Sequence, residues 1–369
     1  MTWRSILLTP NVLGKDGVSA LSREMARALP GPSLILSLHD APVPAAQSPV
    51  GSEVRGARGS RAAFLLTAAR AARQTTSETT VACSHLHLAP IARMLTGLAG
   101  HGARPTVVLC GIEAWTPLRR LERWALRASD VMAISQHTVD RFKSANPGLR
   151  ALDVSVCHPG LPVMHVTGAP PSGPSSMALI VARMSSSERY KGHDALLDVW
   201  PQVLARHPDA VLLVAGDGDD RPRLEAKARE LGIEHAVTFA GRIGDDALAG
   251  LYARCRFFVM PSRNEGFGLV FLEAMRAARP CIGGEGAASE IIEHGVTGFV
   301  VDPGHPGELL AAVLRLYDEP VTCTQLGAAG RERFLAEFTD RHFQARFARV
   351  LAHDAPPKKK SKSLAASLL

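Results

Sequence analysis

Short apolar runs alternate with longer segments of helical periodicity along most of the chain. Runs such as TVVLC at 106–110 and ALIVA at 178–182 contain few polar residues, as expected of strands buried on both faces of a sheet. Strands are expected at 5–9, 34–38, 79–84, 106–110, 130–134 and 153–157, and again at 178–182, 210–214, 236–239, 256–260, 280–282 and 298–301. Helices are expected at 17–29, 61–73, 88–98, 117–128 and 136–145, and again at 193–205, 221–231, 245–253, 268–278, 287–293, 306–318, 322–334 and 339–352. Strands that alternate with helices predict βαβ units and mostly parallel sheets.

A segment rich in Pro, Gly and Ser, HPGLPVMHVTGAPPSGPSSM at 158–177, interrupts this alternation and has the composition of a linker. The sequence therefore predicts two doubly wound α/β domains. The expected parts are a first domain over 1–165, a second over 166–338, a C-terminal helix over 339–354 that crosses back to the first domain, and a disordered Lys-rich tail over 355–369. Such domains bind ligands beyond the carboxyl ends of their strands, so we expect a site in the cleft between them.

The composition fits a globular protein of two domains. The 369 residues are 46% hydrophobic and 21% charged. The sequence contains no run of about 18 uncharged apolar residues, so it predicts no membrane-spanning helix. Its first residues lack the features of a signal peptide. The six cysteines show no CxxC or metal-site spacing, which favours buried, reduced thiols in a cytoplasmic protein.

Positive charge is concentrated in the first half of the chain. The formal net charge is +7, but residues 1–160 hold 18 Lys and Arg against 10 Asp and Glu, whereas residues 161–369 hold 24 against 25. The basic half indicates either an anionic partner or an ordinary set of solvated helices. No RNA- or DNA-binding motif is present, which argues against a nucleic-acid partner.

The segment PLRRLERWALRA at 117–128 is both basic and amphipathic. Leu118, Leu121 and Trp124 fall on one stripe, and four arginines surround it: Arg119, Arg120, Arg123 and Arg127. Such a helix either packs its stripe into the core or lies on an anionic membrane. The sequence leaves both interpretations open.

The densest chemical signal is PSRNEGFGLVFLE at 261–273. Glu265 follows an expected strand, glycines come next, and a helix with Glu273 inside it begins near Leu269. Backbone N–H groups at such a helix start favour a phosphate, and glycines let a ligand approach the backbone closely. A carboxylate one turn into the helix can reach ribose hydroxyls. The alternative for each Glu taken alone is a helix cap or a solvated side chain.

A second signal is ARMSSSERYKGHD at 182–194, where Arg183 and Lys191 follow an expected strand eight residues apart. Two cations at the carboxyl end of a strand are placed to bind a diphosphate, although two exposed loop cations are the plain alternative.

With these residues the chain resembles the family-4 retaining glycosyltransferases (glycosyl transferases group 1), which have the two-Rossmann-domain fold called GT-B. The resemblance covers about 1–352. It rests on the Glu265 to Glu273 cassette, on LLVAGDGDDRPRLEAKARELGI at 212–233 and VTFAGRI at 237–243, on GGEGAASEIIEHGVTGFVVDP at 283–303, and on TPNVLGKDGVSALSREMARAL at 9–29.

The resemblance implies a role for each matching residue. Arg183 and Lys191 would neutralise the diphosphate of a nucleotide-sugar donor, and Glu265 would contact the donor sugar. Donor-binding groups would be the backbone N–H groups of Phe267, Gly268 and Leu269, the ribose-binding Glu273, and Gly14 and Gly17 of the first-domain loop, with Asp16 between them a weaker candidate. No cofactor or metal is expected, because fixed cations would stabilise the leaving diphosphate.

The implied reaction moves a hexose, with retention of configuration, from GDP-mannose or a UDP-hexose to a glycan or to a polyprenyl- or lipid-linked acceptor. The setting would be bacterial exopolysaccharide or glycolipid synthesis, with the protein peripheral on the inner face of the plasma membrane. A nicotinamide dehydrogenase is excluded, because no G-x-G-x-x-G follows the first strand of either half.

One position departs from the family pattern. In VVLCGIEAW at 107–115, Cys110 stands where many relatives have a His that points at the donor sugar. The remaining acceptor-side candidates are Glu113, His85 and His87, and each His has a structural role as its alternative. The substitution keeps open a second hypothesis, a catalytically impaired homologue that binds nucleotide-sugars.

Overall fold

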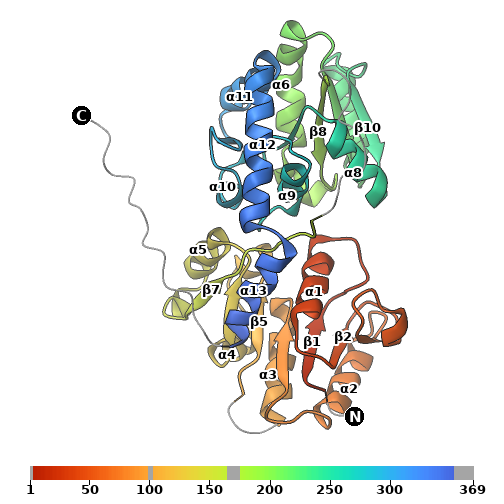
Figure 1. Cartoon of the computed structure of the whole chain (residues 1–369), viewed down its shortest axis with the longest axis vertical. Coiled ribbons are helices and arrows are strands. Elements are labelled where there is room, and N and C mark those ends of the chain that lie inside the picture. The colour runs from red at the N-terminus through yellow and green to blue at the C-terminus, as the bar shows by residue number, and fades with distance from the viewer. Residues whose placement is uncertain (1–2, 99–102, 164–174, 353–369) are drawn as a thin grey trace, which may run out of the picture.

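The protein has two α/β domains, one in each half of the chain, and each is built on a parallel β-sheet. The domains lie one beyond the other along the long axis of the molecule (Figure 1). The structure is a computed structural model that describes residues 3–98, 103–163 and 175–352. The expected boundary between the domains at 165 and 166 and the expected tail over 355–369 lie outside the described residues.

The first domain contains a seven-stranded parallel sheet in the order β3-β2-β1-β4-β5-β6-β7. Its strands are β1 (Ser5–Thr9), β2 (Ser33–Ser37), β3 (Glu53–Gly56), β4 (Thr80–Cys83), β5 (Thr106–Leu109), β6 (Asp130–Ala133) and β7 (Val154–Val156). Its helices are α1 (Gly17–Ala28), α2 (Arg61–Ala72), α3 (Ala89–Leu98), α4 (Arg120–Arg127) and α5 (Gln136–Ala145).

The second domain contains a six-stranded parallel sheet in the order β10-β9-β8-β11-β12-β13. Its strands are β8 (Met177–Val181), β9 (Val211–Ala215), β10 (Val237–Gly241), β11 (Phe257–Met260), β12 (Cys281–Gly284) and β13 (Gly298–Val301). Its helices are α6 (His193–Arg206), α7 (Arg221–Glu230), α8 (Asp245–Arg254), α9 (Leu269–Arg276), α10 (Ala288–Ile291), α11 (Pro306–Asp318) and α12 (Pro320–Glu337). The predicted α/β fold with two doubly wound domains is confirmed.

The expected strands and helices all occur, with ends that shift by a few residues, but one strand was missed. β3 pairs with β2 at the edge of the first sheet and has the sequence EVRG. A four-residue strand with two charged residues and a terminal Gly lacks the apolar run that identifies the other strands. β3 is the outermost strand of the sheet, a position where short strands and charged side chains are common.

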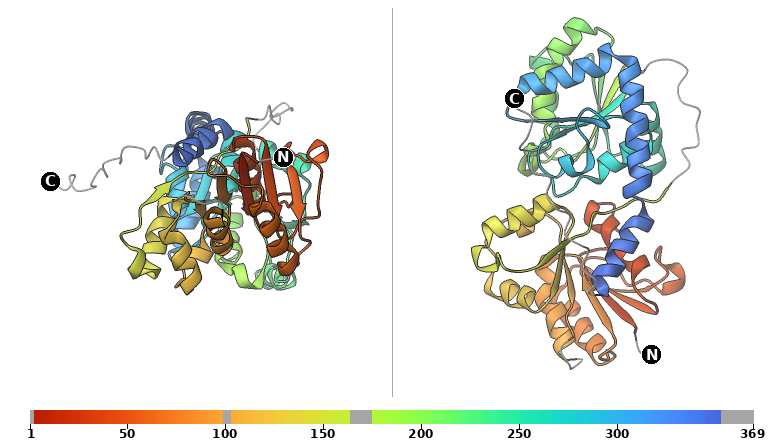
Figure 2. Two further views of the ribbon diagram at one scale, coloured as in Figure 1. Left: turned by 90° about the horizontal axis from the view of Figure 1, so that it is seen from below. Right: turned by 60° about the vertical axis from the view of Figure 1, so that its left-hand side comes forward.

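The last helix, α13 (Asp340–Leu351), leaves the second domain and packs on α1 of the first (Figures 1 and 2). Its buried Phe343 and Phe347 belong to an apolar core that also contains Leu7 of the first sheet and continues into the second domain. On the opposite face of the first sheet, α2, α3, α4 and α5 cover a separate core. One face of the first sheet therefore depends on residues more than 300 positions away.

The position of α4 contradicts one of the two interpretations of the apolar stripe in segment 117–128. Leu118 is buried, but Leu121 and Trp124 are 67% and 48% exposed, and the side chains that α4 buries are Glu122, Ala125 and Leu126. The expectation that the whole stripe packs into the core is wrong, because the stripe and the buried face lie on different sides of the helix. In the described part of the chain, no helix is both long enough and apolar enough to cross a membrane.

Candidate functional site

The loop after β11 has the backbone shape expected of a phosphate-binding turn. Gly268 precedes α9 with a φ of +98°, and a Cβ there would lie 2.6 Å from the Phe271 ring, so only glycine fits. The N–H groups of Phe267, Gly268 and Leu269 donate to no acceptor in the described part of the chain. Three donors therefore remain available for an anion at the start of an eight-residue helix.

Lys191 and Glu265, 74 residues apart in sequence, meet at this loop. The Lys191 Nζ donates to the Glu265 Oε2 at 2.5 Å, and the two side chains are only 17% and 18% exposed. Lys191 is positioned by Gly192, whose φ is +91° and whose missing Cβ allows contact with Pro261 at the end of β11. The fold thus brings together the cation and the carboxylate that the resemblance expects to contact the diphosphate and the sugar of a donor.

Arg183 follows β8 in the neighbouring loop and is 63% exposed. Its only ion pair in the described residues is a long one of 3.5 Å with Glu188. A weakly held, exposed guanidinium is free to turn toward a diphosphate, unlike Lys191, which already has a close partner.

Glu273 points from α9 toward a buried tyrosine. Its Oε2 accepts a hydrogen bond of 2.8 Å from the hydroxyl of Tyr252 in α8. Burial raises the pKa of Glu273 above its usual range, and the Tyr252 hydroxyl only partly opposes this effect. Sequence analysis missed Tyr252, because one tyrosine in an amphipathic helix gives no chemical signal.

The acidic loop GDGDD at 216–220 supports the Arg183 loop. Asp219 accepts hydrogen bonds from the backbone and hydroxyl of Ser186, and Asp217 and Asp220 make backbone hydrogen bonds to Met184. A Cβ on Gly218 would lie 1.9 Å from the Met184 carbonyl oxygen, so glycine is needed for this close approach.

The glycine-rich loop of the first domain faces the second. A Cβ on Gly17 would lie 4.0 Å from Leu269, and a Cβ on Gly14 would lie 2.5 Å from the Ser19 hydroxyl. Asp16 caps α1 by accepting from the Ser19 N–H, and its carboxylate also accepts from the Ser19 hydroxyl and from Asn11. Burial alone would raise the pKa of Asp16, but the hydrogen bonds lower it. Asp40, which sequence analysis missed, anchors the loop by accepting from the Val12 N–H at 2.6 Å.

The acceptor-side candidates make structural contacts. The Cys110 thiol donates to the Ser84 carbonyl at 3.1 Å, and burial raises the pKa of Cys110 well above its ordinary value. Glu113 accepts from the N–H groups of Cys110 and Gly111, so it holds the loop rather than pointing away from it. His85 accepts from the His87 N–H.

His87 also has a local partner. Its Nδ1 lies 2.9 Å from the carboxylate of Glu122 in α4, and Glu122 accepts from the Arg119 N–H as well. Each of the four acceptor-side candidates therefore holds a loop or a helix end in this structure.

The two domains touch at the loop of residues 265–268, here called the donor loop after the role expected of it. A Cβ on Gly266 would lie 2.3 Å from the Cys110 carbonyl oxygen, and a Cβ on Gly111 would lie 3.2 Å from the Gly266 Cα. The Ser135 hydroxyl donates to the Gly266 carbonyl at 2.7 Å. Two facing glycines thus let the loop that carries Cys110 reach the loop that carries Glu265.

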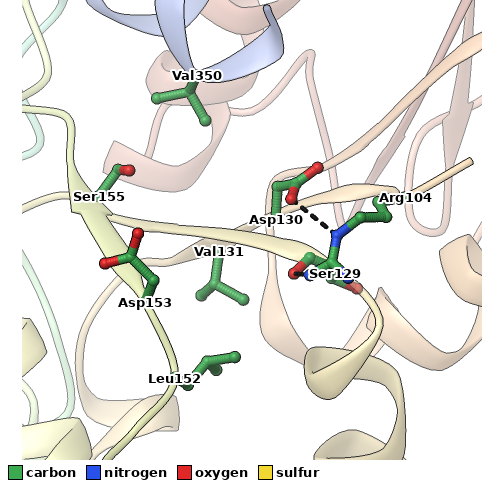
Figure 3. A pocket seen from close by; sticks show the side chains of 8 residues that line it. All are labelled: Arg104, Ser129, Asp130, Val131, Leu152, Asp153, Ser155 and Val350. Carbon is green, nitrogen blue, oxygen red and sulfur yellow. Dashed lines mark hydrogen bonds and ion pairs between the residues drawn. The ribbon is translucent and has the colours of Figure 1, made fainter. Parts of the chain in front are cut away.

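A small, open pocket lies at the other end of the first sheet, away from these loops (Figure 3). It has a volume of about 160 Å³ and lies where β5, β6 and β7 begin, with Val350 of α13 above it. Arg104 closes one side through an ion pair of 2.9 Å with Asp130. Ligands of parallel sheets bind at the opposite, carboxyl ends of the strands, and we assign this pocket no role.

The described residues contain no evident set of side chains for binding a metal ion. No group of three or more His, Cys, Asp or Glu side chains in the described ranges is arranged to hold a metal ion. The expectation that the chemistry needs no metal stays a prediction.

Comparison with known proteins connects this geometry to a family. Residues 175–319 match the family model described as glycosyl transferases group 1. This segment contains Arg183, Lys191, Glu265 and Glu273. The match lies within the second domain, whereas the expected resemblance extended over almost the whole chain.

Two curated relatives illustrate the similarity. A GDP-mannose-dependent monoacylated alpha-(1-6)-phosphatidylinositol monomannoside mannosyltransferase of Corynebacterium glutamicum is 33% identical over 223 residues, which are 56% of this chain and 57% of that protein. A glycogen synthase of Mycobacterium tuberculosis is 31% identical over 225 residues, which are 59% of this chain and 53% of that protein. The chain thus spans about half the length of the curated relatives it matches.

Solved structures extend the fold similarity to both domains. Anabaena HepE in complex with UDP and glucose gives a TM-score of 0.78 at 19% identity, covering 95% of this chain and 99% of that one. Sucrose-phosphate synthase from Thermosynechococcus elongatus gives 0.70 at 19% identity, covering 95% and 98%. The resemblance to the group 1 glycosyltransferases is therefore confirmed: residues 175–319 match their family model, and the two described domains together have the GT-B fold.

Proposed function

We propose that the protein is a retaining, metal-independent glycosyltransferase that takes a hexose from a nucleoside-diphosphate sugar. The observation that carries the proposal is the Lys191–Glu265 pair of 2.5 Å beside the three free N–H groups of residues 267–269. This set offers a cation, an anion-binding helix start and a carboxylate within one loop cluster. The family match of residues 175–319 supports the same conclusion.

In the proposed reaction, the bond between the anomeric carbon and the β-phosphate oxygen breaks while the acceptor oxygen bonds to the same face of that carbon. The acceptor proton passes to the leaving phosphate oxygen, which leaves configuration retained and requires no protein nucleophile. Lys191 and Arg183 stabilise the negative charge that grows on the diphosphate. When the donor binds, before any bond breaks, Glu265 exchanges its contact with Lys191 for one with a sugar hydroxyl.

For the donor we propose GDP-mannose or a UDP-hexose. The Corynebacterium relative is named as GDP-mannose-dependent, and the Anabaena structure holds UDP and glucose, so both nucleotides have support. A thermal-shift panel of UDP, GDP and their hexose conjugates tests this choice. A ligand at about 100 times its Kd adds about 2.7 kcal/mol of stability, which such a panel detects.

Transfer itself is tested with the donor that binds. Product formation with the α-anomer retained, in buffer containing EDTA, is the expected result. Inverted product, or activity that EDTA abolishes, would overturn the retaining or the metal-independent part of the proposal. Tight donor binding with neither transfer nor slow donor hydrolysis would favour the second candidate, a nucleotide-sugar-binding homologue, which the Cys110 substitution keeps in view.

For the acceptor we propose a glycan or a polyprenyl- or lipid-linked compound, with the protein held at an anionic membrane on the cytoplasmic side. The support is the α2–α4 surface, formed by the outer sides of three helices that pack side by side. Its exposed apolar side chains are Leu65, Leu66, Met94, Leu98, Leu121 and Trp124, and its exposed arginines are Arg61, Arg70, Arg120, Arg123 and Arg127.

The charge of this surface is uncompensated. The only acidic residue in α2, α3 and α4 is Glu122, which is buried. None of the five arginines makes an ion pair within the described residues. Exposed apolar side chains flanked by unpaired arginines fit an anionic lipid surface. Flotation with phosphatidylglycerol vesicles at low salt tests this part, and protein that stays in the dense fraction would rule it out.

A further inference from the structure

We infer that Glu290 is a positioning residue that fixes the donor loop by binding the first turn of α5 across the boundary between the domains. The inference deepens the proposed function and rests on it, because the loop it positions is the proposed donor site. Glu290 lies in α10 of the second domain, opposite the start of α5 in the first (Figure 1).

The Glu290 carboxylate acts as a cap for a helix of the other domain. It accepts from the Gln136 N–H at 2.7 Å and from the His137 N–H at 2.8 Å, and these are the first two residues of α5. The first N–H groups of a helix have no partner within it, and a carboxylate there also faces the positive end of the helix dipole. Burial alone would raise the pKa of Glu290, but the hydrogen bonds from His158 and from these two N–H groups lower it.

The same carboxylate is connected to the donor loop. The Glu290 Oε2 lies 2.9 Å from the Nε2 of His158, in the segment after β7, and the His158 ring stacks on Phe267 with centroids 5.5 Å apart. On the other side of the loop, the Ser135 hydroxyl at the cap of α5 bonds to the Gly266 carbonyl. The start of α5 therefore contacts the donor loop directly through Ser135 and indirectly through Glu290 and His158.

This arrangement couples the contact between the two domains to the shape of the donor loop. The nucleotide would contact mainly the second domain, so its affinity needs no bond from α5. Transfer, in contrast, needs the loop of residues 265–268 and the first domain held together, and small misplacements of reacting groups reduce rates strongly. Loss of Glu290 should therefore lower kcat and leave nucleotide binding nearly unchanged.

The first experiment needs no ligand. In hydrogen–deuterium exchange of the full chain, the Gln136 and His137 amides should exchange at least about 10-fold faster in Glu290→Ala than in the wild type, because freed first-turn N–H groups have no other partner. Glu293→Ala is the matched control, since Glu293 lies three residues away and pairs at 3.7 Å with Arg333 of its own domain. Unchanged exchange in Glu290→Ala would overturn the inference.

The second experiment separates positioning from stability. With the nucleotide-sugar that the wild type uses, Glu290→Ala should lower kcat about 10- to 100-fold, while the Kd for the corresponding nucleoside diphosphate changes less than about threefold. Glu290→Gln keeps an oxygen acceptor and should recover part of the loss, so it decides the question if the alanine variant folds poorly. Equal losses in kcat and nucleotide affinity would show a merely structural role.

A third variant tests the contact between Glu290 and the His158 ring. His158→Phe keeps an aromatic ring against Phe267 but removes the contact with Glu290, and we expect a smaller fall in kcat than for Glu290→Ala. An equal or larger fall would place the effect in His158 alone and contradict the assignment to Glu290. If the wild type transfers no sugar, the proposed function fails, while the exchange experiment still decides whether Glu290 holds the domains together.

Discussion

The two domains differ in whether their positively charged side chains have acidic partners. In the second domain, carboxylates neutralise the cations near the donor end: Arg223 pairs with Asp194 at 2.7 Å, Lys227 pairs with Asp198 at 2.8 Å, and Lys191 pairs with Glu265. On the α2–α4 surface of the first domain, the arginines have no acidic partner in the described residues. Paired cations hold loops in place, whereas unpaired and exposed ones remain available to a partner.

The largest expected effect is at Lys191, whose partner Glu265 belongs to the site itself. Lys191→Ala should lower turnover roughly 10²- to 10³-fold while the fold survives, because the cation stabilises charge that develops on the leaving diphosphate. Arg189→Ala is the control, since Arg189 lies two residues away and pairs with Asp220 at 2.9 Å. Steady-state kinetics with near-wild-type kcat for Lys191→Ala would remove the diphosphate assignment.

Binding to lipid vesicles tests the role of the unpaired arginines on the α2–α4 surface. Replacing Arg120, Arg123 and Arg127 with Ala should lower the partition coefficient onto phosphatidylglycerol vesicles about 10²-fold, at about 1 kcal/mol for each charge. A control triple in the second domain, with Ala at Arg206, Arg229 and Arg315, changes the net charge equally. Similar losses in both triples would mean that only total charge matters.

Protonation should weaken the second domain next to Lys191. His193, the first residue of α6, is buried, and desolvation lowers its pKa from 6.5 to about 4. Between these values the unfolded state binds the proton and the folded state does not, so stability falls as pH falls from about 6.5 to 4. His193→Gln should remove about 3 kcal/mol of that pH dependence in urea unfolding.

The smallest effect is expected at Cys110, in the first domain but beside the donor loop. Because its thiol is bound to the Ser84 carbonyl and burial raises its pKa, it is no nucleophile. Cys110→Ser keeps a hydrogen-bond donor, and kcat should change less than about threefold. Abolished transfer would show that the sulfur takes part in the chemistry.

Local signals in the sequence were enough to predict almost all of the helices and strands. Each strand with a continuous apolar run was identified, and the missed β3 has none. Gly268 stands out in the sequence by its place before an expected helix, and the structure gives it a positive φ there. Its role in donor binding stays a prediction. These features depend on neighbours in sequence, so a sequence pattern contains them.

Contacts between distant segments could not be predicted in this way. Glu290 and His158 lie 132 residues apart, and neither has a local pattern that indicates its partner. Leu121 and Trp124 share a helical stripe with Leu118, yet the direction of a stripe depends on how α4 sits on the sheet. Glu113 has the right chemistry for a site, but its carboxylate is used by the backbone of its own loop.

The path of α13 has a consequence for how the protein is made. Phe343 and Phe347 cover the face of the first sheet that includes Leu7, although a ribosome synthesises Leu7 more than 300 residues earlier. Helix α1 covers part of this face, but the first domain cannot complete its burial while the second is being translated, even though N-terminal domains commonly fold first. Throughout that interval the nascent chain presents an open apolar surface, the kind of surface that chaperones bind. Completion of the first domain thus waits for the last helix to emerge.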